Sequence, residues 1–214
     1  MVISTNKRRS RIDPRKEATR VAIVESAETL FAHYGIEGVS LRQIGRASGS
    51  SNTGVVAYHF GSKESLVEAV FHYRLPSIET RRRELLHEVR DLGQEGDTYF
   101  LLWALCLPLF EQVNEDGLHT FAGFLSALIH SPMGGIRLAM NINYPISAEL
   151  SECLKNSIPT ELLQNFESRI KITTVMVTGV LKVIDQANRP EESLPLFEDT
   201  LRMASAALLA PVGV

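Results

Sequence analysis

A run of 27 residues that begins at Ser40, SLRQIGRASGSSNTGVVAYHFGSKESL, constrains the fold of this chain more than any other segment. Ser40 and Gln43 form an S-x-x-Q capping box, in which a hydroxyl and an amide satisfy the free backbone donors at a helix start. A helix is therefore predicted from Leu41. Gly49 is expected to end it, because glycine readily takes the left-handed conformation of a helix stop. A second helix is predicted to open in the polar run 50–53.

The two predicted helices carry different kinds of side chain. In the first, Leu41, Ile44 and Ala47 recur at helical spacing and are expected to be buried. The second combines apolar anchors with outward-facing hydrogen-bonding groups. The anchors are Val55, Val56 and Phe60, and the outward-facing residues are Ser51, Asn52, Thr53, Tyr58 and His59. This arrangement is typical of a helix-turn-helix whose second helix enters the major groove of DNA.

Three stretches between Arg20 and Phe71 carry a family resemblance: ESAETLFAHYGIEGVS, LRQIGRASG and, above all, YHFGSKESL. They resemble the DNA-binding domain of the tetracycline-repressor (TetR) family of one-component bacterial regulators. The resemblance implies a bundle after this domain that binds a small effector and dimerises through its last two helices. The chain departs from the family pattern at Ala57, where many relatives carry an aromatic residue that often contacts a phosphate.

The chemistry of the motif suggests a division of roles on DNA. The residues expected to contact it are Arg42, Ser51, Asn52, Thr53, Tyr58, His59 and Lys63. Asn52 can pair with adenine through two hydrogen bonds, and its two neighbours can reach base edges or phosphates. Tyr58, His59 and Lys63 are expected to contact phosphates. Arg42 is expected to clamp the backbone or reach a guanine. For any single residue, the alternative is a side chain that only faces solvent.

Basic residues are concentrated at the start of the chain. Residues 1–63 hold ten Lys or Arg against five Asp or Glu, a balance of +5, and the remainder holds twelve against twenty, a balance of −8. Positive charge thus coincides with the predicted DNA motif. Residues 1–12 are expected to be a flexible basic arm, in which Arg8, Arg9 and Arg11 reach the DNA minor groove. The alternative is a solvated tail without a partner.

Apolar periodicity predicts helix after helix and no convincing strand. We therefore expect an all-α protein of about nine helices, with a helix-turn-helix domain over 13–63 and an effector-binding and dimerisation domain over 64–214. The first helix is predicted over 14–34, and the fourth, from Ser62, runs to about residue 89. The remaining helices are predicted over 97–113, 118–129, 136–155, 161–185 and 194–209, separated by glycines and prolines.

The last two predicted helices carry more apolar residues than one buried face needs. Ile170, Val177 and Ile184 recur every seven residues and can serve the chain's own core. The residues left for a partner are Ile172, Val175, Met176, Val180 and Val183, with the stripe Phe197, Leu201, Ala204 and Leu208. The alternative is a helix fully buried in one bundle. The resemblance favours a homodimer, whose recognition helices would lie about 34–36 Å apart, or a multiple of that, on a palindromic operator.

By the same resemblance, the bundle is expected to hold a pocket for an unknown small-molecule effector. The candidate lining residues are Trp103, Phe110, Phe121, Phe124, Met140 and Met176, with His119, His130, Arg137 and Tyr144 as polar anchors. An aromatic lining favours a mostly apolar ligand. The alternative for each of these side chains is an ordinary place in the core.

Other functions have less support in the sequence. Cys106 and Cys153 are far apart and lack metal-ligating neighbours, so they are expected to be buried thiols in a reducing cytoplasm, with redox sensing as the alternative. No nucleophile signature or phosphate-binding glycine loop supports an enzyme or a cofactor. An adaptor that has lost DNA binding is a further alternative. No secretory signal is recognisable, and the longest apolar run, 99–110, is too short to span a bilayer. We expect a cytoplasmic, ligand-responsive repressor with no membrane partner.

Overall fold

The computed structural model describes residues 13–52, 54–136, 144–187 and 189–212, and these residues contain helices and no strand. Nine α-helices and two short 3-10 helices have their bounds in this part of the chain. They are α1 (Pro14–Tyr34), α2 (Leu41–Ala47), α3 (Val55–Phe60), α4 (Lys63–Asp91), α5 (Thr98–Glu111), α6 (Thr120–Ile129), η1 (Pro132–Gly134), α8 (Pro145–Asn156), η2 (Thr160–Asn165), α9 (Phe166–Ala187) and α10 (Pro190–Leu209). The predicted all-α class is confirmed. Among the described helices, none is both long and apolar enough to cross a membrane.

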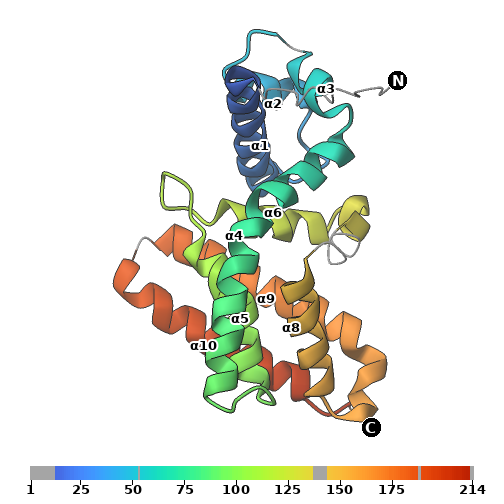
Figure 1. The fold of residues 1–214 in the computed structure, drawn as a ribbon, viewed down its shortest axis with the longest axis vertical. Helices are drawn as coiled ribbons and strands as arrows, with labels where there is room; N and C mark the ends of the chain where they lie inside the picture. The colour runs from blue at the N-terminus through green and yellow to red at the C-terminus, as the bar shows by residue number, and fades with distance from the viewer. Residues whose placement is uncertain (1–12, 53, 137–143, 188, 213–214) are drawn as a thin grey trace, which may run out of the picture.

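The helices form two groups. The long helix α4 joins them, and α1 of the first group packs on α6 at the junction (Figure 1). In Figure 1, α1, α2 and α3 lie together at one end, and α4 runs from them along the length of the molecule. The helices α5, α8, α9 and α10 gather at the other end, and α6 lies across the junction. The contact of α1 with α6 is the most extensive between any two elements. The helix-turn-helix end therefore packs directly on the C-terminal bundle.

Local signals decide where several helices begin and end. The carboxylate of Asp13 accepts a hydrogen bond from the backbone N–H of Arg15 at 3.0 Å, and Pro14 occupies the first helical turn, where its missing N–H costs nothing. Gly35, with φ of 75°, follows the last residue of α1. The hydroxyl of Ser62 accepts from the N–H of Ser65 at 3.1 Å and caps α4. The predicted bounds of α1 are confirmed.

Two predicted helix spans in the second half are wrong, and both errors concern a proline. A single helix over 136–155 is excluded because Tyr144 is non-helical and α8 begins at Pro145. The last helix begins at Pro190 and not at Leu194. The sequence predicts a break at Pro190, but a proline in the first turn can start a helix, since its φ is already helical and its missing N–H needs no partner there.

The segment predicted as one helix over 161–185 is also divided. It opens with the 3-10 turn η2, and the α-helix proper begins at Phe166 and continues to Ala187. Pro159 precedes η2 with φ of −52° and ψ of 139°. The tighter 3-10 turn is common at a helix start, where the hydrogen-bonding pattern is not yet established.

Candidate nucleic-acid interface

The turn between α2 and α3 is held by contacts within the motif. The N–H of Ser40 donates to Oε1 of Gln43 at 2.8 Å, and the N–H of Gln43 donates to Oγ of Ser40 at 3.3 Å, which confirms the predicted capping box. Gly49 follows α2 with φ of 78°, a conformation that favours glycine. A Cβ on Gly45 would lie 3.3 Å from Cγ1 of Val55. Glycine there lets the two helices approach closely.

The recognition helix starts later than the sequence reading expected. The run 50–53 does not open it, because α3 begins at Val55 and Gly54 is its N-cap. Oδ1 of Asn52 accepts a hydrogen bond from the N–H of Gly54 at 2.9 Å. An asparagine side chain that bonds the backbone two residues ahead forms a turn that competes with helix. Asn52 therefore precedes the helix and shapes its entry.

The outward face of this motif is as open as a DNA contact requires. Tyr58 on α3 is 74 % exposed, and Arg42, Ser51, Asn52 and Ala57 are also exposed. The predicted anchors Val55 and Val56 are buried. Thr53 lies outside the described residues. The exposed side chains form a polar surface, and the contacts predicted for them with DNA stay predictions.

Two basic residues of α1, which the sequence reading did not include, lie against α3. Nη1 of Arg20 donates to the backbone carbonyl of His59 at 2.9 Å, and its guanidinium lies 4.6 Å from the ring centroid of Phe60. Nζ of Lys16 lies 5.5 Å from the ring centroid of Tyr58. The four-residue spacing of Lys16 and Arg20, which puts both on one helix face, was the available signal. Which face it was required the packing of α1 on α3.

His59 is held in an environment that disfavours its charged form. Its Nδ1 is the only buried side-chain nitrogen or oxygen without a hydrogen-bond partner that is found among the described residues. Its ring is edge-on to Tyr58, with centroids 5.0 Å apart. Burial lowers the pKa of His59 below 6.5, the nearby charges of Arg20 and Lys16 lower it further, and Glu17 opposes them. A DNA phosphate would supply the negative charge that this site lacks.

Lys63, predicted to contact a phosphate, also has a contact inside the motif. Its Nζ donates to the backbone carbonyl of Ile36 at 3.0 Å, and the side chain is partly buried. This bond ties the first turn of α4 to the loop between α1 and α2. An ammonium group has three donors, so two remain for a phosphate, and that contact stays a prediction.

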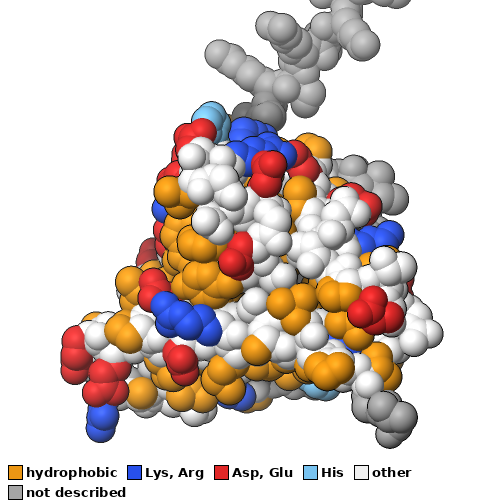
Figure 2. Space-filling view, turned by 90° about the horizontal axis from the view of Figure 1, so that it is seen from below, with side chains coloured by type: hydrophobic (Ala, Val, Ile, Leu, Met, Phe, Trp, Pro, Cys, Tyr) orange, Lys and Arg blue, Asp and Glu red, His pale blue; other side chains and the backbone are white. Residues whose placement is uncertain are grey.

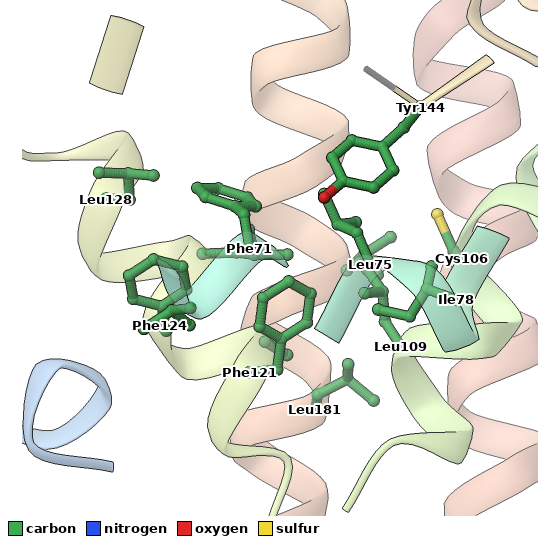
Figure 3. Packing of buried hydrophobic residues seen from close by; sticks show 14 of the residues in the cluster. Phe71, Leu75, Ile78, Cys106, Leu109, Phe121, Phe124, Leu128, Tyr144 and Leu181 are labelled. Atoms are coloured by element: carbon green, nitrogen blue, oxygen red, sulfur yellow. The ribbon is translucent and has the colours of Figure 1, made fainter. Parts of the chain in front are cut away.

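Phe121 and Phe124, predicted to line an effector pocket, are packed in the interior. They are 2 % and 0 % exposed. Their rings lie 6.1 and 5.4 Å from that of Phe71, centroid to centroid (Figure 3). Phe124 also lies 6.2 Å from Phe31 of α1. The two residues therefore join α6 to α4 and α1, which is the core position that the sequence left open as the alternative.

The remaining effector candidates have separate surroundings. His130 is exposed with Nδ1 2.8 Å from the carbonyl of Ser126, whereas Tyr144 is buried with its hydroxyl 2.9 Å from Nδ1 of His72. Nδ1 of His119 lies 2.5 Å from Oδ1 of Asp185. The side chains that are partly buried and packed on the core are Trp103, Phe110 and Met176. Arg137 and Met140 lie outside the described residues.

Two hollows lie on the surface formed by the described residues. One, of about 200 Å³, lies between α1, α6 and α9 and includes His130. The other, of about 470 Å³, is lined by residues from the start of α5 and from α10, and it includes none of the predicted residues. Effector binding by the predicted set therefore stays a prediction.

The last two helices differ in part from the predicted partner surface. Val180 is 8 % exposed and belongs to the inner face of α9, and the stripe of α10 is fully buried within the chain, so both assignments to a partner are wrong. That stripe comprises Phe197, Leu201, Ala204 and Leu208. The reason is that α10 packs on both α9 and α5, and the ring of Phe197 lies 4.9 Å from that of Phe110 of α5, centroid to centroid. Met176 is partly buried against the core.

An outer face of α9 remains without a partner among the described residues. It comprises Ile172, Val175 and Val183, which are 59 %, 38 % and 52 % exposed, and Gly179, where a Cβ would meet no atom within 4 Å. Exposed apolar residues of α10 are Leu194, Leu196, Met203 and Leu209. Seen from the end away from α1–α3, hydrophobic side chains lie among charged ones over the surface (Figure 2). Exposed apolar clusters of this kind mark interaction sites.

Neither of the two cysteines is exposed on the surface. Cys106 is buried and Cys153 is half-buried. Burial raises the pKa of the Cys153 thiol, although Arg90 opposes this shift. The reactive form of a cysteine is the thiolate, so this environment does not favour the redox-sensing alternative.

Comparison with known proteins agrees with the architecture. Residues 23–70 match the family model described as "Bacterial regulatory proteins, tetR family". The chain is 40 % identical over 189 residues to the HTH-type transcriptional repressor AcnR of Corynebacterium glutamicum, a match that covers 86 % of this chain and 93 % of that protein.

A solved structure shares the fold. It is a tetR family transcription regulator from Shewanella sp. PV-4, with a TM-score of 0.56 and 18 % sequence identity. The match covers 88 % of this chain and 97 % of that one. At this identity the likeness concerns the fold alone.

Proposed function

Because the chain belongs to the tetR family of bacterial regulatory proteins and is a DNA-binding transcriptional regulator, we propose that it is a repressor that binds a palindromic operator as a homodimer. In this proposal, binding of a small molecule to the C-terminal bundle releases the operator. Its relative of 40 % identity is a transcriptional repressor, which supports the direction of control.

The observation that carries the proposal is the open polar surface of α3 beside the basic residues of α1. Tyr58 is 74 % exposed, and Lys16 and Arg20 lie against the same helix. A recognition helix reads base edges, while cations and hydroxyls beside it hold the phosphates and set the register. The polar surface of α3 and the basic residues of α1, which DNA binding needs together, therefore lie on one side of the helix-turn-helix domain.

The outer face of α9 supports the homodimer. Three of its residues are β-branched and apolar, and Gly179 lets another backbone approach closely. A two-fold axis across such a face would pair it with its own copy, since a symmetric dimer uses the same patch twice. Two recognition helices would then face DNA together. An effector that prefers a dimer in which the recognition helices are spaced differently would weaken operator binding. The size of this effect is set by the difference between the effector's affinities for that dimer and for the operator-binding dimer.

A footprint on the DNA upstream of the chain's own gene tests the function. The expected result is protection of an inverted repeat, with half-sites about 34–36 Å apart or a multiple of that distance. Random DNA of the same length is the control. Equal binding to both DNA molecules would contradict the proposal.

Asn52 is expected to act in sequence recognition as well as in the entry to α3. Asn52→Ala should lower discrimination at one base pair by about 1–3 kcal/mol, whereas Lys63→Ala should weaken binding to all sequences. Asn52→Asp is the matched control, because its carboxylate can still accept from Gly54 but lacks the amide donor. Binding assays on operators with single base changes measure the effect. If Asn52→Asp discriminates as well as the wild type, Asn52 only shapes the turn.

Operator affinity is expected to rise as the pH falls towards 6. A phosphate near His59 would favour its charged form, so the pKa of His59 would be higher in the complex than in the free protein, where it is lowered. Between these two pKa values the complex binds more protons, and acid therefore strengthens binding. Titrations at matched salt should show this slope, and His59→Gln should remove it. His33→Gln, at an exposed site of α1, should retain it. Identical slopes for wild type and His59→Gln would exclude the linkage.

A further inference from the structure

A buried carboxylate on α1 connects three helices at the junction between the helix-turn-helix domain and the bundle. Glu28 is 0 % exposed. Its Oε2 accepts from Nε of Arg74 at 2.6 Å, and its Oε1 accepts from Nη2 of the same guanidinium at 2.9 Å. Oε1 also accepts from the hydroxyl of Thr120 at 2.5 Å. Arg74 belongs to α4 and Thr120 is the first residue of α6, so one side chain links α1 to both.

The ion pair between Arg74 and Glu28 has a fixed geometry. Burial alone would lower the pKa of Arg74, but its bonds and attraction to Glu28 outweigh that effect and raise it. Nearby, the hydroxyl of Tyr73 donates to Glu25 at 2.6 Å, at a more exposed position. Two parallel N–H···O bonds between guanidinium and carboxylate fix both distance and angle. The geometry therefore resists rotation of α1 relative to α4.

Stability alone is a poor explanation for this charge pair. Burying a carboxylate and a guanidinium costs desolvation energy, and well-packed apolar residues of similar volume are often as stable or more so. The junction already has apolar packing, because Phe31, Phe71 and Phe124 meet there. A Cβ on Gly123 would lie only 2.8 Å from Cβ of Ala32, so α1 and α6 are in close contact. What the ion pair adds is a defined orientation.

The pair lies beside a weak point of α4. Pro76, two residues after Arg74, lies inside this helix and has no N–H to bond the carbonyl of His72. Helices bend most readily at such a proline. Nδ1 of His72 in turn lies 2.9 Å from the hydroxyl of Tyr144. The contact of Arg74 with Glu28 therefore fixes α1 on α4 close to the point where the backbone of α4 resists bending least.

We propose that Glu28, held by Arg74 and Thr120, is a positioning residue that sets the angle of the helix-turn-helix domain on the bundle and thereby the half-site spacing that the dimer accepts. This inference rests on the proposed function. A rigid junction presents two recognition helices at one separation and gains from binding both half-sites together. A loose junction accepts several separations but must be ordered on binding, which lowers its affinity for the best operator.

The test compares Arg74→Gln with Arg81→Gln. Both residues belong to α4 and both make a two-nitrogen contact with a glutamate, but Arg81 bonds Glu111 of α5 and does not reach α1. Affinities are measured for the operator found by footprinting, for operators with the spacer lengthened or shortened by one base pair, and for a single half-site. The wild type and Arg81→Gln should lose about tenfold or more when the spacer changes. Arg74→Gln should lose much less, with half-site affinity unchanged.

A folded Arg74→Gln that discriminates spacers like the wild type would overturn the proposal. So would an equal loss on every DNA molecule including the half-site, because that result indicates a structural role only. If Arg74→Gln does not fold, Thr120→Val is decisive, since it removes one bond to Glu28 and keeps the side-chain shape. It should reduce spacer discrimination, and wild-type discrimination would refute the assignment. Absence of sequence-specific binding by the wild-type protein would instead contradict the proposed function.

Discussion

Val183→Asp is expected to convert the homodimer to a monomer and to lower the affinity for the full operator by about 100-fold or more. Val183 is 52 % exposed on the outer face of α9, so the substitution does not disturb the interior of the chain. In a symmetric dimer it would place two carboxylates in an apolar interface, where each loses its hydration without gaining a partner. The loss of avidity between half-sites then accounts for the loss in DNA binding.

Val113→Asp is the matched control. Val113 is 45 % exposed in the loop that follows α5, and it is not part of the outer face of α9. The same change there should leave both assembly and binding unaltered. Sedimentation equilibrium measures the mass, and a gel shift on the full operator and a half-site measures the affinities. A Val183→Asp protein that remains a dimer would show that the outer face of α9 is not the interface.

Phe124→Ala is expected to lower the free energy of unfolding by about 3–5 kcal/mol. Its ring is fully buried against rings from α1 and α4 (Figure 3), and truncation would leave a cavity where the two parts of the chain meet. For a protein of this size the midpoint of thermal unfolding should fall by roughly 10 °C. Calorimetry and urea unfolding measure the change.

Tyr34→Ala is the control for the loss of an aromatic ring. Tyr34 is 69 % exposed at the end of α1, and its truncation should change the unfolding free energy by no more than about 0.5 kcal/mol. If Phe124→Ala were equally mild, Phe124 would not be a core residue, and a place in the lining of an effector pocket would gain support.

Local chemistry made the helix-turn-helix predictable to within a few residues. The capping box at Ser40, the glycine turn and the cap at Asp13 act through neighbours in the chain, so their effect can be read without the fold. The exception is the start of α3, where the side chain of Asn52 bonds Gly54 and delays the helix. A polar run such as 50–53 can either begin a helix or form a turn before it, and the sequence alone does not distinguish these two outcomes.

Pairwise packing decided the features that the sequence reading missed. Apolar periodicity identified Phe197 and Leu201 as a stripe but did not show whether the stripe packs inside the chain or against another subunit. Lys16 and Arg20 share a face of α1, yet only the packing of α1 on α3 brings that face to the recognition helix. In the sequence, Glu28 is an ordinary helical glutamate, and only the tertiary structure shows that it bonds Arg74 and Thr120.

The sequence by itself determined the helical class, the ends of α1, the turn before the recognition helix and the family, because each depends on periodicity or on contacts between near neighbours in the chain. The tertiary structure alone decided which apolar faces are used inside the chain and which remain open. It also decided that a buried carboxylate joins the DNA-binding helices to the bundle. The physical reason is that the contacts of Glu28 are made with residues 46 and 92 positions away along the chain. A local sequence pattern does not show which distant residues will pack beside it.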